Sequence, residues 1–580
     1  MFDRLREPGY LTEHQLRVVR PDGNIFLTAC PGSGKTRAGG VRVARLADDG
    51  VRVAACSYTN VGVEQIRRVI TSDLRVILGP AHFVGTLHAF LLRYVLYPFG
   101  HLVTGSTGTP RLVADDADWP DVVFNRDNRV RLPLSRFRFQ PDGTLCVRSV
   151  PLKFKHTPED AARIGQADAH RMKLLTARNR GIVSFDDAMY WALRVLRGYP
   201  ALATAIAGRF DELLIDEAQD TSELQLACLE ALCATGGLRS LTLIGDLEQS
   251  ICSYTGASRA GCEALAEQQG LTPIDLSENH RSSQRICDVA VHFCSRGEPD
   301  RAVGEDADCP WHPELTLYPS DEPAQAVEYF RSRLTDVTHD ERDAAVLARS
   351  NDLVNEINGY TTPVDVAARP LAIGRAVSAL RGSGTLGRRD LEAVDRVLAF
   401  TAWDSADLAL LESEQRWPLR QATMRLLINA PDLTLDLRAW IRGTAAVLAD
   451  AVATLVDEPT HAAGRVLRSA SGQEEHVAGS VFVPPLHTLR AQTVHDIKGE
   501  SRGAVLVVVD RLRSRRRGAQ GTLWSRPLVG EDVTAQEAEE LRIAFVALTR
   551  ARRLCVLALP SDNGAEVIDA FQAVGFRLAS

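Results

Sequence analysis

The sequence predicts an α/β fold with parallel sheets, and two observations lead to this prediction. Short apolar runs recur along the chain, and each ends in a polar or glycine-rich loop. Apolar runs of this length are typical of strands that are buried on both faces of a parallel sheet. Helical stretches lie between the runs, and this alternation is typical of α/β layers. The expected strands are NIFLTAC (24–30), VRVAACSYTN (51–60), DELLIDEAQD (211–220), SLTLIGD (240–246), AAVLARS (344–350) and GAVLVVVD (503–510).

Two long stretches interrupt the alternation of strands and helices. Residues 91–183 are less regular and rich in arginine. Residues 376–485 are rich in Ala, Leu and Arg, and their pattern is helical, for example at 436–456. We expect both stretches to be insertions into the α/β layers. Shorter helices are expected at VEQIRRVI (63–70) and ELQLACLEALC (223–233).

The composition excludes several classes of protein. The chain has 580 residues, of which 45% are hydrophobic, and 67 Lys+Arg against 74 Asp+Glu give a net charge of −7. These values indicate a globular protein of several domains, and they exclude a disordered, collagen-like or uniformly basic DNA-coating protein. A nucleic-acid site must therefore be a local groove. The 11 cysteines include no CxxC pair, so we expect reduced thiols and no zinc site.

The N-terminal segment and the hydropathy pattern bear on the cellular compartment. MFDRLREPGYLTEHQ lacks the apolar segment of a secretory signal. The apolar run at Val505–Asp510 has the length of a strand, and no run approaches the length of a membrane span. We therefore expect a cytoplasmic protein without a membrane partner.

A phosphate-binding loop follows the first predicted strand and precedes a helical stretch. It reads ACPGSGKT (29–36), with Ala in place of the usual first Gly. Glycines let backbone N–H groups turn toward phosphate oxygens, and the next helix N-terminus adds positive charge. We expect Lys35 to hold the β- and γ-phosphates and Thr36 to bind Mg²⁺. The alternative, a plain glycine turn, is disfavoured by the intact GSGKT in this context. The loop residues expected to bind the nucleotide are Ala29, Gly32, Ser33, Gly34, Lys35 and Thr36.

A pair of carboxylates stands at the end of the predicted strand at 211–220. We expect Asp216 to contact Mg²⁺, directly or through water, and Glu217 to activate the attacking water. The alternative is an acidic pair at a helix start, where the helix dipole favours negative charge. The phosphate-binding loop elsewhere in the chain favours the catalytic interpretation.

The chain carries, in order, LTEHQ (11–15), ACPGSGKT (29–36), SYTN (57–60), VGTLH (84–88), DEAQDT (216–221), GDLEQS (245–250), ENHRS (278–282), TVHDIKGE (493–500) and LRIAFVALTRA (541–551). Together these motifs resemble those of the UvrD/Rep family of superfamily 1A DNA helicases, over nearly the whole chain. The resemblance implies two RecA-like P-loop domains, 1A and 2A, that sandwich ATP and Mg²⁺. It also implies a mainly helical subdomain inserted into each, and 3′-to-5′ movement on single-stranded DNA. The expected bounds are 1–90 and 184–276 for 1A, 91–183 for 1B, 277–375 and 486–580 for 2A, and 376–485 for 2B.

The resemblance also implies contacts to the nucleotide base. Gln15 would read the adenine edge, and Arg37 would pack on the base. His280 stands where the family usually has a tyrosine that stacks on adenine. Many relatives have Lys-Gly-Leu-Glu where this chain has Lys-Gly-Glu-Ser, so a nucleotide-contacting glutamate is missing or displaced to Glu500.

Three further residues are expected at the γ-phosphate by resemblance. Gln249 would lie near it, and Arg281 and Arg550 would bring positive charge from the second domain. A phosphoryl-transfer transition state spreads negative charge over the γ-oxygens, so cations beyond Mg²⁺ are needed. If both arginines belong to another domain, they complete the site only when the two domains close, and hydrolysis becomes coupled to movement. The alternative for each arginine is a surface salt bridge.

Binding to single-stranded DNA requires aromatic faces for bases and donors for phosphates. The aromatic candidates are Tyr58 and Tyr254. A structural role, with aromatics in the core and histidines satisfied, is the alternative that the resemblance disfavours. The full set of expected DNA-binding residues is Tyr58, Thr59, Asn60, Thr86, His88, Tyr254 and His495.

Several departures from the family pattern leave the cellular role open. Cys252 and Thr255 replace a usual aromatic residue and a usual arginine, which weakens the expected link between DNA and ATP. The motif at 493–500 resembles that of helicases from phage-defence operons, such as the Gabija type. The expected partners are single-stranded DNA, junctions of single- and double-stranded DNA, and a nuclease or a repair protein. The alternatives to a helicase are a DNA-stimulated ATPase that regulates a partner nuclease in antiviral defence, and a P-loop metabolite kinase.

Two basic segments are not explained by these motifs. Residues 134–148 have the pattern of a β-hairpin around Pro-Asp-Gly, with Arg136, Arg138 and Arg148 on the polar side. This side is expected to be either a phosphate-binding ridge or a solvated face. The run at 511–517 is the densest basic segment, and it is either a phosphate-binding loop or a solvated one.

Overall fold

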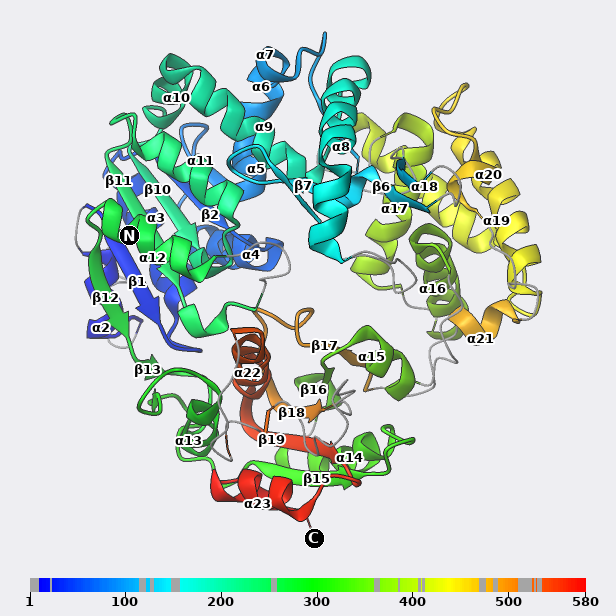
Figure 1. Ribbon diagram of the computed structural model, residues 1–580. Helices are drawn as coiled ribbons and strands as arrows, with labels where there is room; N and C mark the ends of the chain where they lie inside the picture. The colour runs from blue at the N-terminus through cyan, green and yellow to red at the C-terminus, as the bar shows by residue number, and fades with distance from the viewer. Residues whose placement is uncertain are drawn as a thin grey trace.

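The chain folds into two lobes, each built on a six-stranded sheet of parallel strands (Figure 1), and this confirms the predicted α/β fold class. The first lobe comprises the first sheet and its flanking helices, and the second lobe comprises the second sheet and its own helices. No helix among the described residues is long and apolar enough to cross a membrane. The computed structural model describes residues 10–20, 23–113, 121–125, 130–147, 157–251, 258–338, 340–358, 366–383, 386–404, 408, 411, 413–468, 476–482, 489–509, 524–525, 528 and 535–579.

The first sheet contains the four strands predicted at 24–30, 51–60, 211–220 and 240–246. Its strand order is β12-β1-β11-β10-β2-β3, and every pair that is hydrogen-bonded is parallel. Every residue of β2, β10 and β11 is buried, as expected for strands covered on both faces. The strands are β1 (Ile25–Ala29), β2 (Val53–Ser57), β3 (Phe83–Thr86), β10 (Glu212–Asp216), β11 (Ser240–Gly245) and β12 (Thr272–Leu276).

The helices of the first lobe cover both faces of this sheet, and several begin at side-chain caps. Thr12 and Ser222 each form a capping box, which satisfies two backbone N–H groups at a helix start. The helices and short turns are α2 (Glu13–Val19), α3 (Lys35–Asp48), α4 (Asn60–Arg68), η1 (Val69–Asp73), η5 (Ala218–Asp220), α11 (Glu223–Cys233), η6 (Leu247–Gln249) and α12 (Arg259–Gln268).

The second sheet has the order β17-β16-β18-β19-β15-β20 and is also parallel. Its strands are β15 (Glu314–Tyr318), β16 (Ala344–Ala348), β17 (Ala491–Thr493), β18 (Arg502–Val508), β19 (Ala551–Pro560) and β20 (Arg577–Leu578). The other elements of this lobe are β13 (Glu278–Asn279), α13 (Gln284–Ala290), η8 (Val291–Phe293), β14 (Arg301–Ala302), α14 (Gln325–Val337), η9 (Glu341–Asp343), α15 (Asn351–Ile357), α22 (Ala535–Leu548) and α23 (Ala565–Ala573).

A mixed insertion lies between β3 and β10. It contains three two-stranded sheets, with the pairs β4-β9, β5-β6 and β7-β8. The predicted hairpin is confirmed at β7 and β8, although residues 134–136 form a 3-10 turn rather than strand. The run at 511–517 lies outside the described residues, as does Arg148. The elements are α5 (Leu87–Leu91), η2 (Leu92–Leu96), α6 (Tyr97–Phe99), α7 (His101–Thr104), β4 (Arg111–Val113), β5 (Asp121–Asn125), β6 (Val130–Pro133), η4 (Leu134–Arg136), β7 (Phe137–Phe139), β8 (Leu145–Val147), α8 (Pro158–Arg180), β9 (Ile182–Ser184), α9 (Phe185–Gly198) and α10 (Pro200–Ala207).

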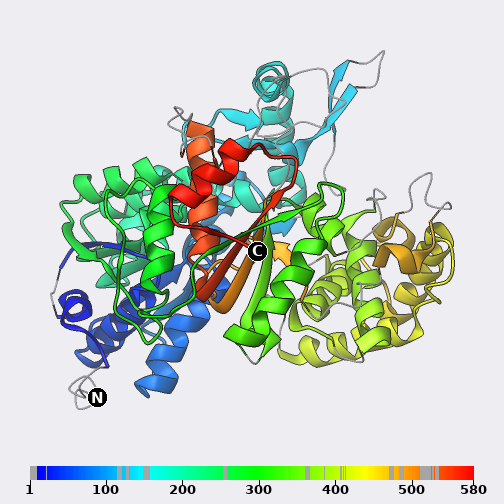
Figure 2. The same cartoon turned by 90° about the horizontal axis from the view of Figure 1, so that it is seen from below.

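A helical insertion lies between β16 and β17 and has a hydrophobic core of its own. Trp440 and Phe482 meet in this core with ring centroids 4.7 Å apart. Figure 2 shows these helices as a group beside the second sheet. The domain bounds expected from the sequence stay predictions, and the one at residue 376 falls within α16. The helices are α16 (Ala368–Ser383), α17 (Arg388–Trp403), α18 (Ser413–Asn429), α19 (Leu437–Val452), α20 (Ala463–Val466) and α21 (Ala478–Phe482).

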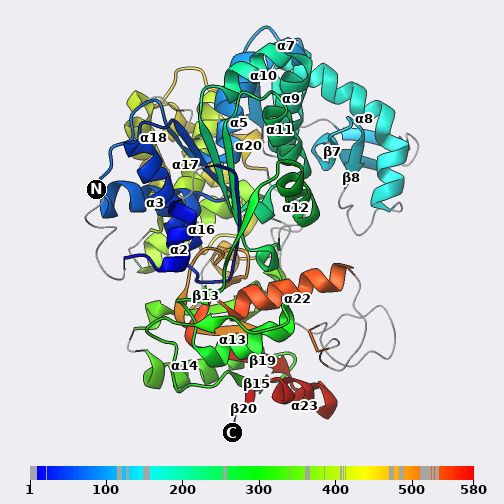
Figure 3. The same ribbon diagram turned by 90° about the vertical axis from the view of Figure 1, so that its left-hand side faces the viewer.

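The two lobes face each other across α22, which belongs to the second lobe. Figures 1 and 3 both place this helix between the first lobe and the second sheet. Arg542 of α22 donates a hydrogen bond from Nε to the Ser250 carbonyl of the first lobe, at 2.9 Å. In the first lobe, Asp216 pairs in register with Ser57 and Ile244, so several predicted motifs end at one edge of the sheet.

Candidate functional site

The phosphate-binding loop lies between the end of β1 and the start of α3. Gly32 and Gly34 have φ values of 73° and 77°, a region that favours glycine. A Cβ atom on Gly34 would lie 2.5 Å from Gln15 Nε2, so the loop also has no room for a side chain there. The Ser33 hydroxyl is enclosed and has no hydrogen-bond partner among the described residues. The loop and the N-terminus of α3 can therefore donate to an anion.

The carboxylates of β10 reach this loop. Thr36 donates from Oγ1 to Asp216 Oδ2 at 3.0 Å, and Lys35 Nζ lies 3.2 Å from Glu217 Oε1. Asp216 Oδ1 is buried without a hydrogen-bond partner among the described residues. A hydroxyl and a carboxylate oxygen that converge in this way fit the oxygen ligands that Mg²⁺ prefers.

The two carboxylates have different electrostatic environments. Burial, and then the neighbouring charge of Glu217, raise the pKa of Asp216 to about 7, against the opposing charge of Lys35. Burial acts to raise the pKa of Glu217 as well, but Lys35 and Lys498 outweigh it and hold this pKa at about 2. Glu217 is therefore ionised at neutral pH and can accept a proton or orient a water molecule. Asp216 would gain its full charge when a cation is beside it.

The two predicted arginines of the second lobe reach the first lobe. A Cβ atom on Gly32 would lie 2.4 Å from Arg281 Cβ, so Arg281 packs directly on the phosphate-binding loop. Arg550 is 1% exposed, and it donates from Nη2 to Gln249 Oε1 at 2.7 Å. Burial, together with the charge of Arg281, lowers the pKa of Arg550 to about 9, so the guanidinium remains charged at neutral pH. Arg281 therefore meets the loop itself, and Arg550 lies close enough to Arg281 and Glu217 for their charges to act on it.

The residues expected at the base lie together beside the loop. Gln15 donates from Nε2 to the Ser33 carbonyl at 2.8 Å, and the Arg37 guanidinium lies 4.3 Å from the centre of the Tyr10 ring. The backbone N–H of His280 donates to the Gly32 carbonyl at 3.0 Å. Burial, opposed by the charge of Glu278, lowers the pKa of His280, and the charge of Arg37 adds to this effect. Burial therefore favours the neutral form of the imidazole.

Glu500 contributes its backbone to the site. Its carboxylate accepts a hydrogen bond from Arg502 Nη2, whereas its carbonyl accepts from Arg550 Nη1 at 3.3 Å. A direct contact between the Glu500 carboxylate and a nucleotide stays a prediction.

Three groups that the sequence did not single out complete the site, and Lys498 and Gln219 are buried whereas Arg296 is half-buried. Lys498 donates from Nζ to Asp220 and, at 2.9 Å, to the Gln249 carbonyl. Gln219 donates from Nε2 to Glu217 Oε2 at 2.6 Å. Arg296 pairs with Asp246 at 2.8 Å. Lys498, Gln219 and Asp246 lie inside motifs that the sequence identifies, but Arg296 lies outside every motif.

A large cavity of 1740 Å³ opens between the first lobe, the β7–β8 hairpin and helices α17 and α18. It is lined by four of the residues expected to bind DNA, namely Tyr58, Asn60, Thr86 and His88. The arginine side chains that line it come from all three parts, and they are Arg67, Arg68, Arg138, Arg396, Arg416 and Arg420. Three of these arginines pair with carboxylates that also line the cavity, Arg138 with Asp186, Arg396 with Glu392 and Arg420 with Asp395. The aromatic and arginine side chains are of the kinds that bind a single strand of nucleic acid.

Some of the expected DNA-binding residues already have structural partners. Thr59 and Thr86 cap helices α4 and α5 by accepting from the backbone N–H groups of Gly62 and Ala89, both at 3.0 Å. The His88 ring stacks on Phe185 with centroids 4.7 Å apart. Their contacts to DNA stay predictions.

Two further DNA-binding candidates lie elsewhere. His495 is 3.1 Å from the Ile251 carbonyl through Nε2, and this contact joins the second lobe to the first. A carbonyl can only accept, so Nε2 carries the proton in this hydrogen bond, and burial lowers the pKa of His495 against the effect of the hydrogen bond. Tyr254 lies outside the described residues, with Cys252 and Thr255.

In the hairpin, Arg138 pairs with Asp186 at 2.9 Å, so the phosphate-binding ridge also stays a prediction.

Comparisons with known proteins agree with this geometry. Residues 149–269 match the family described as "UvrD/REP helicase N-terminal domain". The chain is 26% identical over 570 residues to the ATP-dependent DNA helicase UvrD2 of Mycobacterium bovis, which covers 92% of this chain and 76% of that protein. It is 24% identical over 394 residues to the ATP-dependent DNA helicase UvrD1 of Mycobacterium leprae, covering 63% of this chain and 50% of that protein.

A shorter match joins the chain to a protein whose name includes a nuclease. The chain is 34% identical over 197 residues to an ATP-dependent helicase/nuclease subunit of Exiguobacterium sibiricum, covering 32% of this chain. The match spans 16% of that protein. The chain thus spans half or less of the length of several relatives that it matches.

Proposed function

Since the chain is a UvrD/Rep-like protein of helicase superfamily 1, we propose that it hydrolyses ATP and uses the resulting movement of its lobes to travel along single-stranded DNA. The observation that carries this proposal is that Arg281 and Arg550 of the second lobe reach the phosphate-binding loop and Gln249 of the first. Neither lobe alone contains all the cations around the loop. Hydrolysis in such a site requires that the lobes be closed.

The residues of the site have complementary roles in this proposal. Lys35 exchanges Glu217 for phosphate oxygens, which frees the Glu217 carboxylate to orient the attacking water and accept its proton. Arg281 and Arg550 stabilise the negative charge that develops on the γ-phosphoryl oxygens. Thr36 and Asp216 are the residues that would hold Mg²⁺, which supplies further neutralisation of the phosphate charge.

The base and the polynucleotide bind in separate places. Gln15, Arg37 and His280 surround the expected position of the adenine. The large cavity takes the DNA strand, with Tyr58 stacking on a base and the cavity arginines near phosphates. Stacking is tolerant of sequence, so we expect little base specificity. Movement is 3′ to 5′, and junctions of single- and double-stranded DNA are the expected substrates.

The proposal is tested by two measurements on one preparation. ATP hydrolysis is followed with and without a single-stranded oligonucleotide, and strand displacement is followed on duplexes that carry a 3′ or a 5′ tail. We expect stimulation by the oligonucleotide and displacement of the 3′-tailed duplex only. Lys35→Ala should abolish both activities while the circular dichroism spectrum is unchanged. Displacement from the 5′ tail would contradict the polarity, and hydrolysis that ignores DNA would contradict the function.

A second function is a DNA-stimulated ATPase that regulates a partner nuclease in an antiviral defence complex. The similarity to a helicase/nuclease protein favours a nuclease partner. This function predicts oligonucleotide-stimulated hydrolysis with little strand displacement by the purified chain, and recovery of a nuclease with the tagged protein.

A further inference from the structure

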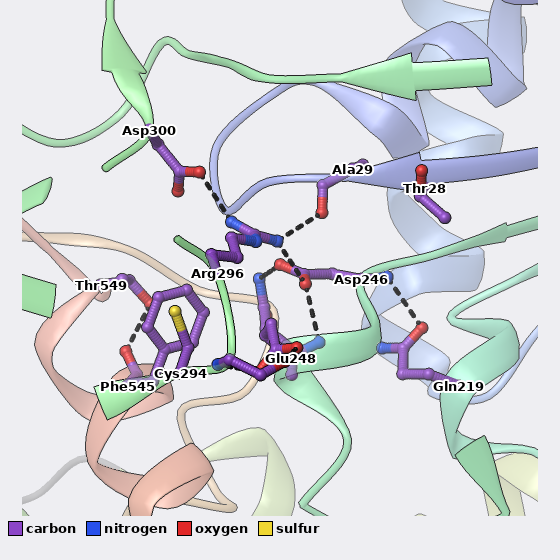
Figure 4. A network of polar contacts seen from close by, with 12 residues as sticks. Thr28, Ala29, Gln219, Asp246, Glu248, Cys294, Arg296, Asp300, Phe545 and Thr549 are labelled. Carbon is purple, nitrogen blue, oxygen red and sulfur yellow. Dashed lines mark hydrogen bonds and ion pairs between the residues drawn. The ribbon is translucent and has the colours of Figure 1, made fainter. Parts of the chain in front are cut away.

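Arg296 joins the two lobes at a point that no sequence motif covers. It lies in the second lobe, after η8, and its Nη2 donates to the Ala29 carbonyl at 3.1 Å and to Asp246 Oδ1 at 2.8 Å, both in the first lobe. Its Nη1 donates to Asp300 Oδ1 at 2.7 Å within its own lobe. Figure 4 shows the guanidinium between Asp300 on one side and Ala29 and Asp246 on the other. One side chain therefore connects the end of β1, the motif at 245–250 and the second lobe.

Asp246, the partner of Arg296 in the first lobe, is the centre of a buried hydrogen-bond network. Asp246 is fully buried, and its Oδ2 accepts from Gln249 Nε2 at 2.8 Å. The other end of the same amide, Gln249 Oε1, accepts from Arg550 Nη2 at 2.7 Å. The Asp246 carboxylate thus determines which end of the Gln249 amide faces Arg550.

The backbone of Asp246 is linked through Gln219 to the expected general base, Glu217. The Asp246 N–H donates to Gln219 Oε1 at 3.1 Å, and Gln219 Nε2 donates to Glu217 Oε2 at 2.6 Å. Two chains of hydrogen bonds therefore start at Asp246, one to Arg550 and one to Glu217. A displacement of Asp246 would disturb both ends.

The environment of Arg296 fits a rigid planar cation. Its guanidinium lies 5.5 Å from the centre of the Phe545 ring on α22, and its side chain is 24% exposed. A planar guanidinium can donate in several fixed directions at once, whereas a lysine ammonium is a point charge on a flexible stem. If Arg296 is removed, the buried Asp246 charge loses its only cationic partner within the described part of the chain, and an unpaired buried charge is strongly unfavourable.

We propose that Arg296 is a positioning residue for ATP hydrolysis, which holds Asp246 so that Gln249 presents its carbonyl oxygen to Arg550 when the lobes are closed. This inference rests on the proposed function, since it names a residue that supports the same site. The hydrogen bonds of Arg296 among the described residues go to Ala29, Asp246 and Asp300, not to Arg281 or Arg550, and we do not expect it to contact the nucleotide.

The pairing itself is tested without ATP hydrolysis. Arg296→Met should lower the urea midpoint of unfolding, and adding Asp246→Asn to Arg296→Met should restore part of the loss, because no buried charge is then left unpaired. Arg301→Met is the matched control, since Arg301 is a 67%-exposed arginine of the same lobe that pairs only with Glu278 among the described residues. A midpoint of the double variant that is no higher than that of Arg296→Met would contradict the pairing.

The positioning role is tested by separating binding from turnover. In Arg296→Met, kcat should fall by about 100-fold, since small displacements of catalytic groups have effects of this size. The Kd for fluorescent mant-ADP should change by less than about threefold, because binding without a reacting phosphate does not use Gln249. Arg296→Lys should recover only part of kcat, and Arg301→Met should match the unaltered protein.

A double-mutant cycle shows whether Arg296 acts through Gln249. If it does, Arg296→Met should lower kcat little further in a Gln249→Ala background. Independent, multiplicative effects on kcat would overturn the inference, as would unchanged kcat in Arg296→Met or a loss confined to nucleotide affinity. An unaltered protein that does not hydrolyse ATP would overturn the proposed function instead, and the urea measurements would still decide the pairing.

Discussion

Lys498 of the second lobe donates a hydrogen bond to the carboxylate of Asp220 in the first lobe, and the two side chains are 7% and 0% exposed. Burial raises the pKa of Asp220, and the charge of Lys498 opposes this effect. Lys498 also donates to the Gln249 carbonyl at 2.9 Å. The two lobes are therefore joined through a buried charge pair that lies beside the proposed catalytic groups.

Removing one partner of this pair should be more harmful than removing both charges. Lys498→Met leaves Asp220 buried and unpaired, so we expect a loss of about 3–5 kcal/mol in the free energy of unfolding. Asp220→Asn combined with Lys498→Met should regain part of this loss. Urea unfolding of the two variants checks the prediction, and equal stability of the single and double variants would argue against it.

The loop glycine beside Arg281 should not tolerate a side chain. Gly32→Ala would place a Cβ atom 2.4 Å from Arg281 Cβ, so the lobes would be forced apart and hydrolysis should be lost. Gly50→Ala is the matched control, because Gly50 also has a positive φ (+78°) but has no atom within 4 Å of the added Cβ. This control should cost about 1 kcal/mol of stability and leave turnover intact. Similar turnover in the two variants would contradict the contact between the loop and Arg281.

Tyr58 should contribute stacking energy to DNA binding. It lines the large cavity and packs against the core of the second lobe. Tyr58→Ala should weaken the affinity for single-stranded DNA by about 5- to 150-fold, the effect of losing one stacked base. Tyr58→Phe should retain most of the affinity. Tyr199→Ala serves as the control, since Tyr199 is 38% exposed and outside the cavity. Fluorescence anisotropy at a fixed salt concentration measures the affinity of the three variants for single-stranded DNA. Unchanged affinity in Tyr58→Ala would exclude stacking of a base on this residue.

His88 should make the stability of the protein depend on pH. Burial lowers the pKa of His88 to about 4 from 6.5, so the unfolded chain binds a proton that the folded protein does not. The contribution of neutral His88 is complete above pH 6.5 and is lost as the pH falls toward 4. The loss should be about 1–3 kcal/mol.

His88→Gln should remove this part of the pH dependence. Urea unfolding at several pH values between 4 and 7.5 compares the variant with the unaltered protein. His101→Gln is the control, because His101 is exposed. If the free energy of unfolding depends on pH in the same way in all three proteins, His88 does not titrate as predicted.

The sequence predicted the fold class and six of the twelve strands of the two sheets, because those strands are marked by local apolar runs. The run DELLIDEAQD (211–220) contains β10 (Glu212–Asp216), whose five residues are all buried, and its end forms the 3-10 turn η5 instead of strand. ACPGSGKT gives the expected strand, turn and helix. The catalytic candidates could be found because each stands inside a motif of fixed spacing. The hairpin was predicted too long, because residues 134–136 turn into a 3-10 segment before β7.

The site residues that the sequence did not predict depend on contacts between distant parts of the chain. Arg296 is a single arginine in a loop, and its partners Asp246 and Ala29 are 50 and 267 positions away. The Glu500 carboxylate pairs with Arg502, two positions along, and the Glu500 backbone carbonyl accepts from Arg550. These arrangements arise from the packing of two lobes, which a motif cannot specify.

The central claim is that one ATP site is completed by both lobes and is coupled to DNA. The most direct test is the steady-state rate of ATP hydrolysis of the unaltered protein and of Arg550→Ala, each with and without an oligothymidine. We predict a rate that rises when the oligonucleotide is added to the unaltered protein, and a rate about 10³-fold lower in Arg550→Ala with the DNA response lost. Hydrolysis that persists in Arg550→Ala, or that is indifferent to the oligonucleotide in the unaltered protein, would contradict the claim.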